Sequence, residues 1–408
     1  MAAIVRTASF KFGANGFTSL LCKASTTYNV SQIAFITRKA NFVDREPKPE
    51  PLKYWKVGLM GLHNDKLLRR FDENSRLLVV DGNVGVGKEQ FAKDLADELD
   101  MLYMPAPTFD DLYISYDGVD IRSFDSQLPP HAQTCDTERF LTDPTHPAAF
   151  PFQINMLQFR FEQYLNALRY ILTSGRGVVL NRSVYSDIVF AEAMLHAGYM
   201  DRGLFRFYNK AREALLPILL KPHLVIYLDA PVDIIKEKIK QQGIPHEVNS
   251  KALTTSYLID IEDSYKKYMK SISTHAHLLV YDWSHGEYDM DKVVDDIECL
   301  NFENYSNKHG KMGDWIFYEP KELKNRREEL LFNSNIYDDY LQVMYQHAPE
   351  FLFLCQEDSV TYERVVVERE EDTFLEANYD DKRTREYPFI EQPRFRRQPR
   401  DFMYLKED

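Results

Sequence analysis

A glycine-rich turn that follows a short apolar segment constrains the fold of this chain more than any other feature. Residues 77–80 are Leu, Leu, Val and Val, a run typical of a buried strand in a parallel sheet. Gly82, Gly85 and Gly87 then let the backbone turn tightly and point several N–H groups into one concavity, and Lys88 adds a positive charge. The spacing Gly-x-x-x-x-Gly-Lys matches a phosphate-binding loop. The sequence therefore predicts a site for nucleotide phosphates between this strand and a helix at 88–99.

One residue of the loop departs from the pattern. The position after Lys88 is normally Ser or Thr, whose hydroxyl binds Mg²⁺, but in this chain it is Glu89. A carboxylate can also bind Mg²⁺, but it adds negative charge beside a triphosphate. The loop alone therefore leaves open whether the chain transfers phosphate or keeps only the shape of such a site.

Composition and charge exclude several classes of protein. Apolar residues make up 44% of the chain and aromatic residues 13%, which favours a globular protein over a disordered one. The net charge of -13 argues against nucleic acid as the main partner, because phosphate backbones bind basic surfaces. No apolar run is long enough for a transmembrane helix. The four cysteines are too widely spaced for a metal site or a disulfide framework.

The start of the chain has the composition of a mitochondrial transit peptide. The first acidic residue is Asp44, and before it stand five Lys or Arg residues and nine Ser or Thr residues. An acid-free leader of this length is unexpected in so acidic a chain. We therefore predict a transit peptide over residues 1–40 that is removed in mitochondria by cleavage somewhere within 25–45, and a disordered basic tail is the alternative.

The rest of the chain divides into a lead-in at 41–75, a domain at 76–300 and a C-terminal extension at 301–408 of irregular and helical structure. Within the domain, strand-like apolar runs alternate with segments of helical periodicity. This alternation predicts an α/β fold with a parallel sheet of about five strands and helices on both faces. Ligands of such sheets bind at the carboxyl ends of the strands, which is where the glycine-rich loop falls.

The order of motifs along residues 75–300 resembles the deoxyribonucleoside kinase family. After the phosphate loop comes Phe152-Gln153 on a predicted long helix, where the family's amide reads the edge of the base. Asn181-Arg182-Ser183 follows the third predicted strand and matches the family's acidic-Arg-Ser motif. The resemblance implies a P-loop kinase-like sheet. It also implies a nucleotide site formed by Gly82, Asn83, Gly85, Gly87, Lys88, Gln153 and Arg182.

Several positions depart from the family pattern in ways that weaken catalysis. The family's general base is the carboxylate of a Glu-Pro motif after the second strand, and this chain has Ala106 there. General base catalysis typically contributes about 10²–10⁴-fold. Asn181 replaces the acidic residue before the arginine, and Leu141 stands where a tyrosine helps to hold the sugar 3′-hydroxyl. Because of these departures from the family it resembles, we expect the chain to have no catalytic residue and no metal ligand. The lid arginines are replaced by lysines that also fit an ordinary charged helix face: Lys236, Lys238 and Lys240.

The leader, the altered loop and the tail are similar to a branch of the family that forms accessory subunits of mitochondrial respiratory complex I (NADH dehydrogenase). This resemblance implies a non-catalytic subunit that supports assembly and stability of the membrane arm from the matrix side. Its partners would be other complex I subunits, and it would lie peripheral to the inner membrane. Arginine and aromatic residues at 387–400 suit an extended arm on such partners, with a disordered tail as the alternative.

Two other functions stay open at this point. An active mitochondrial deoxyribonucleoside kinase with altered residues is the main alternative, and a free nucleotide-binding regulator in the matrix is another. Ala106 and Glu89 favour the structural role. We expect no cofactor to be needed for catalysis, although the loop could hold a (deoxy)nucleotide. FAD has been credited to this branch of the family, but the sequence carries no flavin fingerprint.

Overall fold

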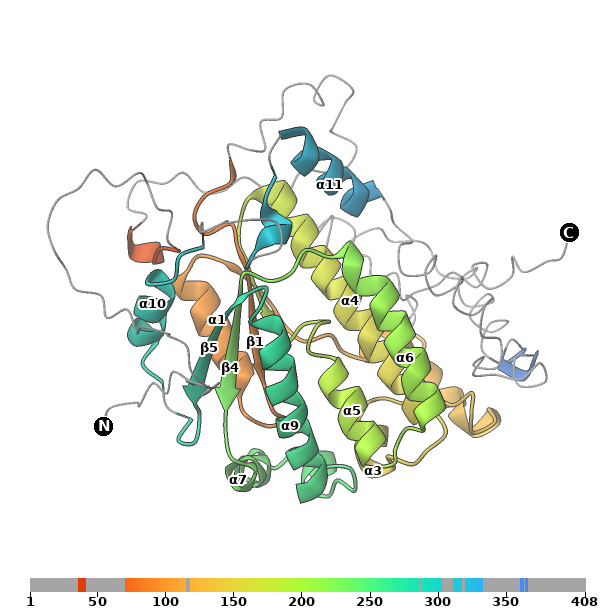
Figure 1. Cartoon of the computed structure of the whole chain (residues 1–408). Coiled ribbons are helices and arrows are strands. Elements are labelled where there is room, and N and C mark those ends of the chain that lie inside the picture. The colour runs from red at the N-terminus through yellow and green to blue at the C-terminus, as the bar shows by residue number, and fades with distance from the viewer. Residues whose placement is uncertain are drawn as a thin grey trace, which may run out of the picture.

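A sheet with helices on both sides forms the centre of the computed structural model (Figure 1). The structure describes residues 36–41, 70–114, 118–286, 288–302, 311–317, 320–332, 360–362 and 364–365. Residues 1–35 of the predicted transit peptide, most of the predicted lead-in (42–69) and the predicted arm at 387–400 lie outside the described residues. These three predictions are therefore not addressed by the structure.

Five parallel strands of the described chain form one sheet in the order β2-β3-β1-β4-β5. Their bounds are β1 Leu77–Gly82, β2 Leu102–Met104, β3 Val178–Asn181, β4 Leu224–Asp229 and β5 His277–Asp282. In the central strand β1, Leu78 pairs with Val179 of β3 and with Leu224 of β4. All six residues of β1 are buried, as a run of Leu and Val requires. The predicted α/β fold with about five strands is confirmed.

The helices cover the two faces of this sheet unequally (Figure 1). One face carries α1 (Lys88–Glu98) with α10 (Met290–Glu298), and the other carries α4 (Ala149–Ser174), α5 (Ile188–His196), α6 (Arg202–Leu215) and α9 (Thr255–Ile272). The shorter or peripheral helices are α2 (Asp110–Tyr113), α3 (Thr137–Thr142), α7 (Val232–Gln242), α8 (Pro245–Val248) and α11 (Pro320–Phe332). None of the described helices is long and apolar enough to span a lipid bilayer.

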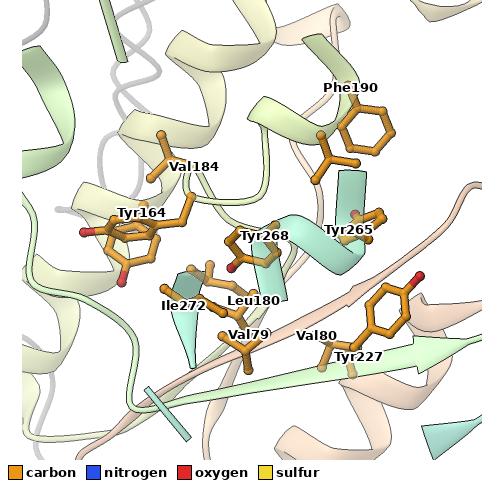
Figure 2. Packing of buried hydrophobic residues seen from close by; sticks show 14 of the residues in the cluster. Val79, Val80, Tyr164, Leu180, Val184, Phe190, Tyr227, Tyr265, Tyr268 and Ile272 are labelled. Atoms are coloured by element: carbon orange, nitrogen blue, oxygen red, sulfur yellow. The ribbon is translucent and has the colours of Figure 1, made fainter. Parts of the chain in front are cut away.

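Large aromatic side chains join α9 to the sheet. Figure 2 shows Tyr265 and Tyr268 of α9 among Val80, Leu180 and Tyr227 of the strands. The rings of Tyr227 and Tyr265 are 5.0 Å apart between centroids. Tyr265 is fully buried, so this contact fixes α9 over the carboxyl half of the sheet, close to the glycine-rich loop.

The first part of the predicted C-terminal extension packs on the domain. The ring of Trp315 lies 4.3 Å from that of His223, and its indole N–H donates to the Lys221 carbonyl at 2.7 Å. Arg169 of α4 donates to the Leu330 carbonyl of α11 at 2.6 Å. These contacts are at the amino-terminal edge of the sheet, because His223 directly precedes β4. The extension therefore begins on the edge opposite the glycine-rich loop.

The end of α4 offers a test of this packing. Gly175 has a φ of +72°, and a Cβ there would lie 2.3 Å from the Arg70 carbonyl oxygen. Gly198 has a φ of +77°, but a Cβ added to it would meet nothing within 4 Å, which makes it a matched control. We expect Gly198→Ala to lower the free energy of unfolding by about 1–2 kcal/mol, the cost of the left-handed backbone alone. Gly175→Ala adds a backbone clash and should lower it clearly further in urea denaturation. Equal losses would contradict the close approach of residue 70 to α4.

Candidate functional site

The glycine-rich loop joins β1 to α1 and packs against β4 and α7. Its glycines permit the backbone conformation of this turn. Gly85 and Gly87 have φ values of +69° and +85°. A Cβ on Gly85 would lie 2.7 Å from Cγ1 of Ile239 in α7, and one on Gly82 would lie 3.1 Å from the Leu228 carbonyl oxygen of β4. The predicted phosphate loop is therefore present as a tight turn, and packing as well as backbone conformation requires glycine there.

Contacts within the protein fix the backbone of the loop. The amide nitrogen of Asn83 donates to the Leu258 carbonyl at 3.2 Å, and its side-chain oxygen accepts from the Val84 N–H at 2.8 Å. The Trp283 indole N–H donates to the Val86 carbonyl at 3.0 Å. Asn83 is 1% exposed, so its role is to hold the turn against α9. The loop thus keeps its shape through contacts on both of its sides.

Two cations converge on the loop. Nζ of Lys88 lies 3.4 Å from the Asn83 carbonyl oxygen, and the guanidinium of Arg182 donates to the Gly82 and Asn83 carbonyls at 3.2 and 3.4 Å. In the described part of the chain, neither cation forms an ion pair with a carboxylate. Arg182 has a φ of +69°, a conformation that costs a non-glycine residue about 1–2 kcal/mol. The structure therefore brings Gly82, Asn83, Lys88 and Arg182 together.

Burial and charge make this group of residues suited to an anion. Burial lowers the pKa of Lys88 well below its usual value, and the charge of Arg182 lowers it further, whereas Asp81 opposes the change. Burial also raises the pKa of Asp81, whose Oδ1 accepts from the Ser186 hydroxyl at 2.7 Å. An anion at the loop would offset the repulsion between Lys88 and Arg182. The arrangement can therefore hold a phosphate group.

Three positions that depart from the kinase pattern, Ala106, Asn181 and Glu89, follow β2, end β3 and begin α1. Ala106 is exposed in the segment after β2, and its methyl group cannot accept a proton. Asn181 is buried at the end of β3. Glu89 is exposed at the start of α1, close enough to Tyr103 that its charge, after burial, helps to raise the pKa of that phenol to about 12. Positions 106 and 181 therefore carry no carboxylate, and Glu89 adds a negative charge at the start of α1.

Gln153, the predicted base reader, is bound by a buried carboxylate. Its amide nitrogen donates to Oδ2 of Asp187 at 2.9 Å. Asp187 is fully buried and also accepts from the guanidinium of Arg160 and the hydroxyl of Tyr208. Arg160 is only 5% exposed, and within the described ranges Asp187 is the carboxylate with which it forms an ion pair. The structure therefore places Gln153 in a buried polar cluster that adjoins the loop, because Arg160 and Arg182 lie over the same ring of Phe190, at 4.9 and 4.5 Å from its centroid.

Phenylalanine rings fill the space beside Gln153. Phe152 stacks on Phe109 and on Phe140, with centroid distances of 5.0 and 4.8 Å and interplanar angles of 13° and 9°. Phe159 meets Phe109 edge to face at 5.1 Å. All four rings are buried. The two faces of the Phe152 ring are therefore in contact with other rings of the protein.

Sequence reasoning missed the residues that complete this end of the site. Arg160 stands seven positions after Gln153, a spacing that places both on one face of α4 and could have drawn attention to it. Asp187 carries no local signal, since its partners come from α4 and α6.

Lys238 donates to the Trp283 carbonyl at 3.0 Å, as an ordinary helix-face lysine would. Among the described residues, no group of three or more His, Cys, Asp or Glu side chains could hold a metal ion.

This chain is similar to known proteins over the domain described above. A family model described as deoxynucleoside kinase matches residues 78–303, more than half of the 408 residues. NADH dehydrogenase (ubiquinone) 1 alpha subcomplex subunit 10 from Mus musculus is 36% identical over 281 residues, which cover 68% of this chain and 76% of the relative. The Bos taurus protein of the same name is 32% identical over 294 residues, covering 71% and 78%. Deoxyguanosine kinase from Dictyostelium discoideum is 26% identical over 269 residues, covering 64% and 85%.

The carboxylate of Asp187 can be tested by substitution. Asp187→Asn leaves Arg160 buried without its counter-charge, and we expect it to lower the free energy of unfolding by about 3–5 kcal/mol. Tyr208→Phe removes one hydrogen bond to the same carboxylate, keeps the charge pair and should cost about 1.5–3 kcal/mol. Urea denaturation followed by circular dichroism measures both. A Tyr208→Phe loss as large as that of Asp187→Asn would show that the ion pair is not the main contribution.

Proposed function

The chain belongs to the deoxynucleoside kinase family and to the branch that contains the subunit 10 proteins of NADH dehydrogenase, and we propose that it is a non-catalytic accessory subunit of mitochondrial complex I. In this role it supports assembly and stability of the membrane arm and does not transfer phosphate. It lies on the matrix side of the inner membrane as a peripheral subunit, and its partners are other complex I subunits. The basic leader serves as its transit peptide.

The internal occupation of the nucleoside end carries this proposal. In the described structure the amide of Gln153 donates to Asp187, and the ring of Phe152 stacks on Phe109 and Phe140. A nucleoside bound at Gln153 would compete with these contacts. Ala106 adds a second obstacle, because it supplies no general base for the 5′-hydroxyl.

The phosphate end supports a narrower role for the loop. Lys88 and Arg182 still face the carbonyls of Gly82 and Asn83, so the loop could hold the phosphates of a (deoxy)nucleotide without turning it over. Such a ligand would stabilise the domain. The proposed role involves no catalysis and therefore needs no catalytic cofactor. FAD is not part of the proposal, because the loop suits the phosphates of a mononucleotide and the sequence has no flavin fingerprint.

An active mitochondrial deoxyribonucleoside kinase is the competing function. The observation that favours it is the survival of the phosphate loop with Lys88 and Arg182 beside it. The similarity to a deoxyguanosine kinase points the same way. A base other than residue 106 and a rearranged nucleoside end would then be needed. The two functions make opposite predictions for turnover.

A phosphoryl-transfer assay decides between them. Purified protein with ATP-Mg²⁺ and each of the four deoxynucleosides is expected to give no turnover above background, because the nucleoside end is filled and residue 106 is alanine. Lys88→Ala and the matched control Lys93→Ala, an exposed lysine of the same helix, should behave like the unmodified protein. Turnover that Lys88→Ala abolishes and Lys93→Ala retains would overturn the non-catalytic role.

Native gel electrophoresis of mitochondrial membranes tests the assembly role. The protein is expected to migrate with a band that oxidises NADH, and depletion of the protein should reduce that band because the membrane arm loses a stabilising subunit. A protein found only at its own mass would contradict membership of complex I. Loss of the assembled band in a Lys88→Ala strain, with Lys93→Ala unaffected, would show that a bound nucleotide contributes to the stability of the subunit.

A further inference from the structure

A short segment that precedes the kinase-like domain by more than thirty residues packs into its core. Ile36 is fully buried within the main hydrophobic cluster. The 3₁₀ turn Lys39–Asn41 that follows it lies beside α1. Residues 36–41 are here called the N-terminal strap. The family model begins only at residue 78, so the strap is an addition to the matched domain.

Asn74 binds the backbone of the strap in both directions. The N–H of Thr37 donates to Oδ1 of Asn74 at 2.8 Å, and the Asn74 amide nitrogen donates to the Thr37 carbonyl at 2.7 Å. The same amide also donates to the Leu99 carbonyl at the end of α1, at 2.8 Å. Asn74 is 1% exposed. Without the strap, a buried amide oxygen would lose this donor, which is costly in a folded protein.

Arg38 anchors the strap to the acidic face of α10. Its guanidinium reaches Oδ1 of Asp291 at 2.7 Å and also pairs with Asp295, while its backbone N–H donates to Oε1 of Glu298 at 3.1 Å. The spacing 291, 295, 298 places these three carboxylates on one face of the helix, where they repel one another. Arg38 relieves that repulsion. The strap therefore joins α10, α1 and the segment before β1.

We propose that the N-terminal strap is retained in the mature protein and that the leader is cut on the amino-terminal side of Ile36. This inference takes the mitochondrial import of the proposed function as its premise. A cut at residue 40, the boundary expected from composition, would remove Ile36, Thr37 and Arg38. It would leave Asn74 and the acidic face of α10 without these partners. Because Ile36 is fully buried in the core, we expect the mature chain to begin at residue 36 or earlier.

Import of the full-length precursor into isolated mitochondria tests the position of the cut. The new α-amino group is labelled after import and located by mass spectrometry. We expect a shortened protein whose first residue is 36 or lower. A first residue of 37 or higher overturns the inference. A precursor that is neither imported nor shortened counts against the proposed mitochondrial function, and the strap is then judged by its effect on stability.

Thermal unfolding of the full-length chain supplies that second measurement. Ile36→Ser and Arg38→Ala should each lower the melting temperature by several degrees, because each removes a contact of the strap with the domain. Lys39→Ala is the matched control, since Lys39 is an exposed cation next to Arg38 and should leave the melting temperature unchanged. Melting temperatures of Ile36→Ser and Arg38→Ala equal to that of Lys39→Ala would show that the strap is dispensable and would overturn its retention.

Discussion

Burial of β1 on both faces is the constraint on which the rest of the structure depends. This strand pairs with β3 and β4, and helices cover both of its faces. The polar side chain of Asp81 must therefore find its hydrogen-bond partners at the carboxyl edge of the sheet. There Asp81 accepts from Ser186, and the chain must turn at once to start α1. The turn needs Gly82 because of β4 and Gly85 because of α7. The packing of the fold thus requires the shape of the loop, whatever the loop binds.

The two ends of the site differ in how their buried polar groups are satisfied. At the phosphate end, Lys88 and Arg182 face main-chain carbonyls and repel each other, which leaves a favourable place for an anion. At the nucleoside end, Asp187 gathers Arg160 and the amide of Gln153, so no ligand is needed to complete the cluster. Polar groups in a low-dielectric interior must find partners somewhere. A cluster that supplies its own partners is stable without a ligand, whereas the two cations at the loop favour one.

Whether the sequence predicts a feature depends on how far apart along the chain the interacting residues lie. The strand at 77–80 and the turn at 82–88 depend on local composition and spacing, so the sheet and the loop could be predicted. Asp187 could not, because its partner Arg160 is 27 positions away and nothing local marks a buried carboxylate. The stacking of Phe109 on Phe152 escaped for the same reason. Periodicity finds the faces of elements, but it does not say which faces meet. The resemblance gave Gln153 a role in base recognition, and only the structure reveals the carboxylate that binds its amide.

Segments outside the matched domain add contacts that do not involve the loop. The strap joins α10 through Arg38, and the extension covers His223 with Trp315 at the opposite edge of the sheet. Each contact ties the chain before or after residues 78–303 to the domain by buried or charge-assisted interactions. These contacts lie away from Lys88, so a change at the loop leaves them in place. A deoxynucleoside kinase fold supported in this way has sources of stability outside the residues that the family model matches.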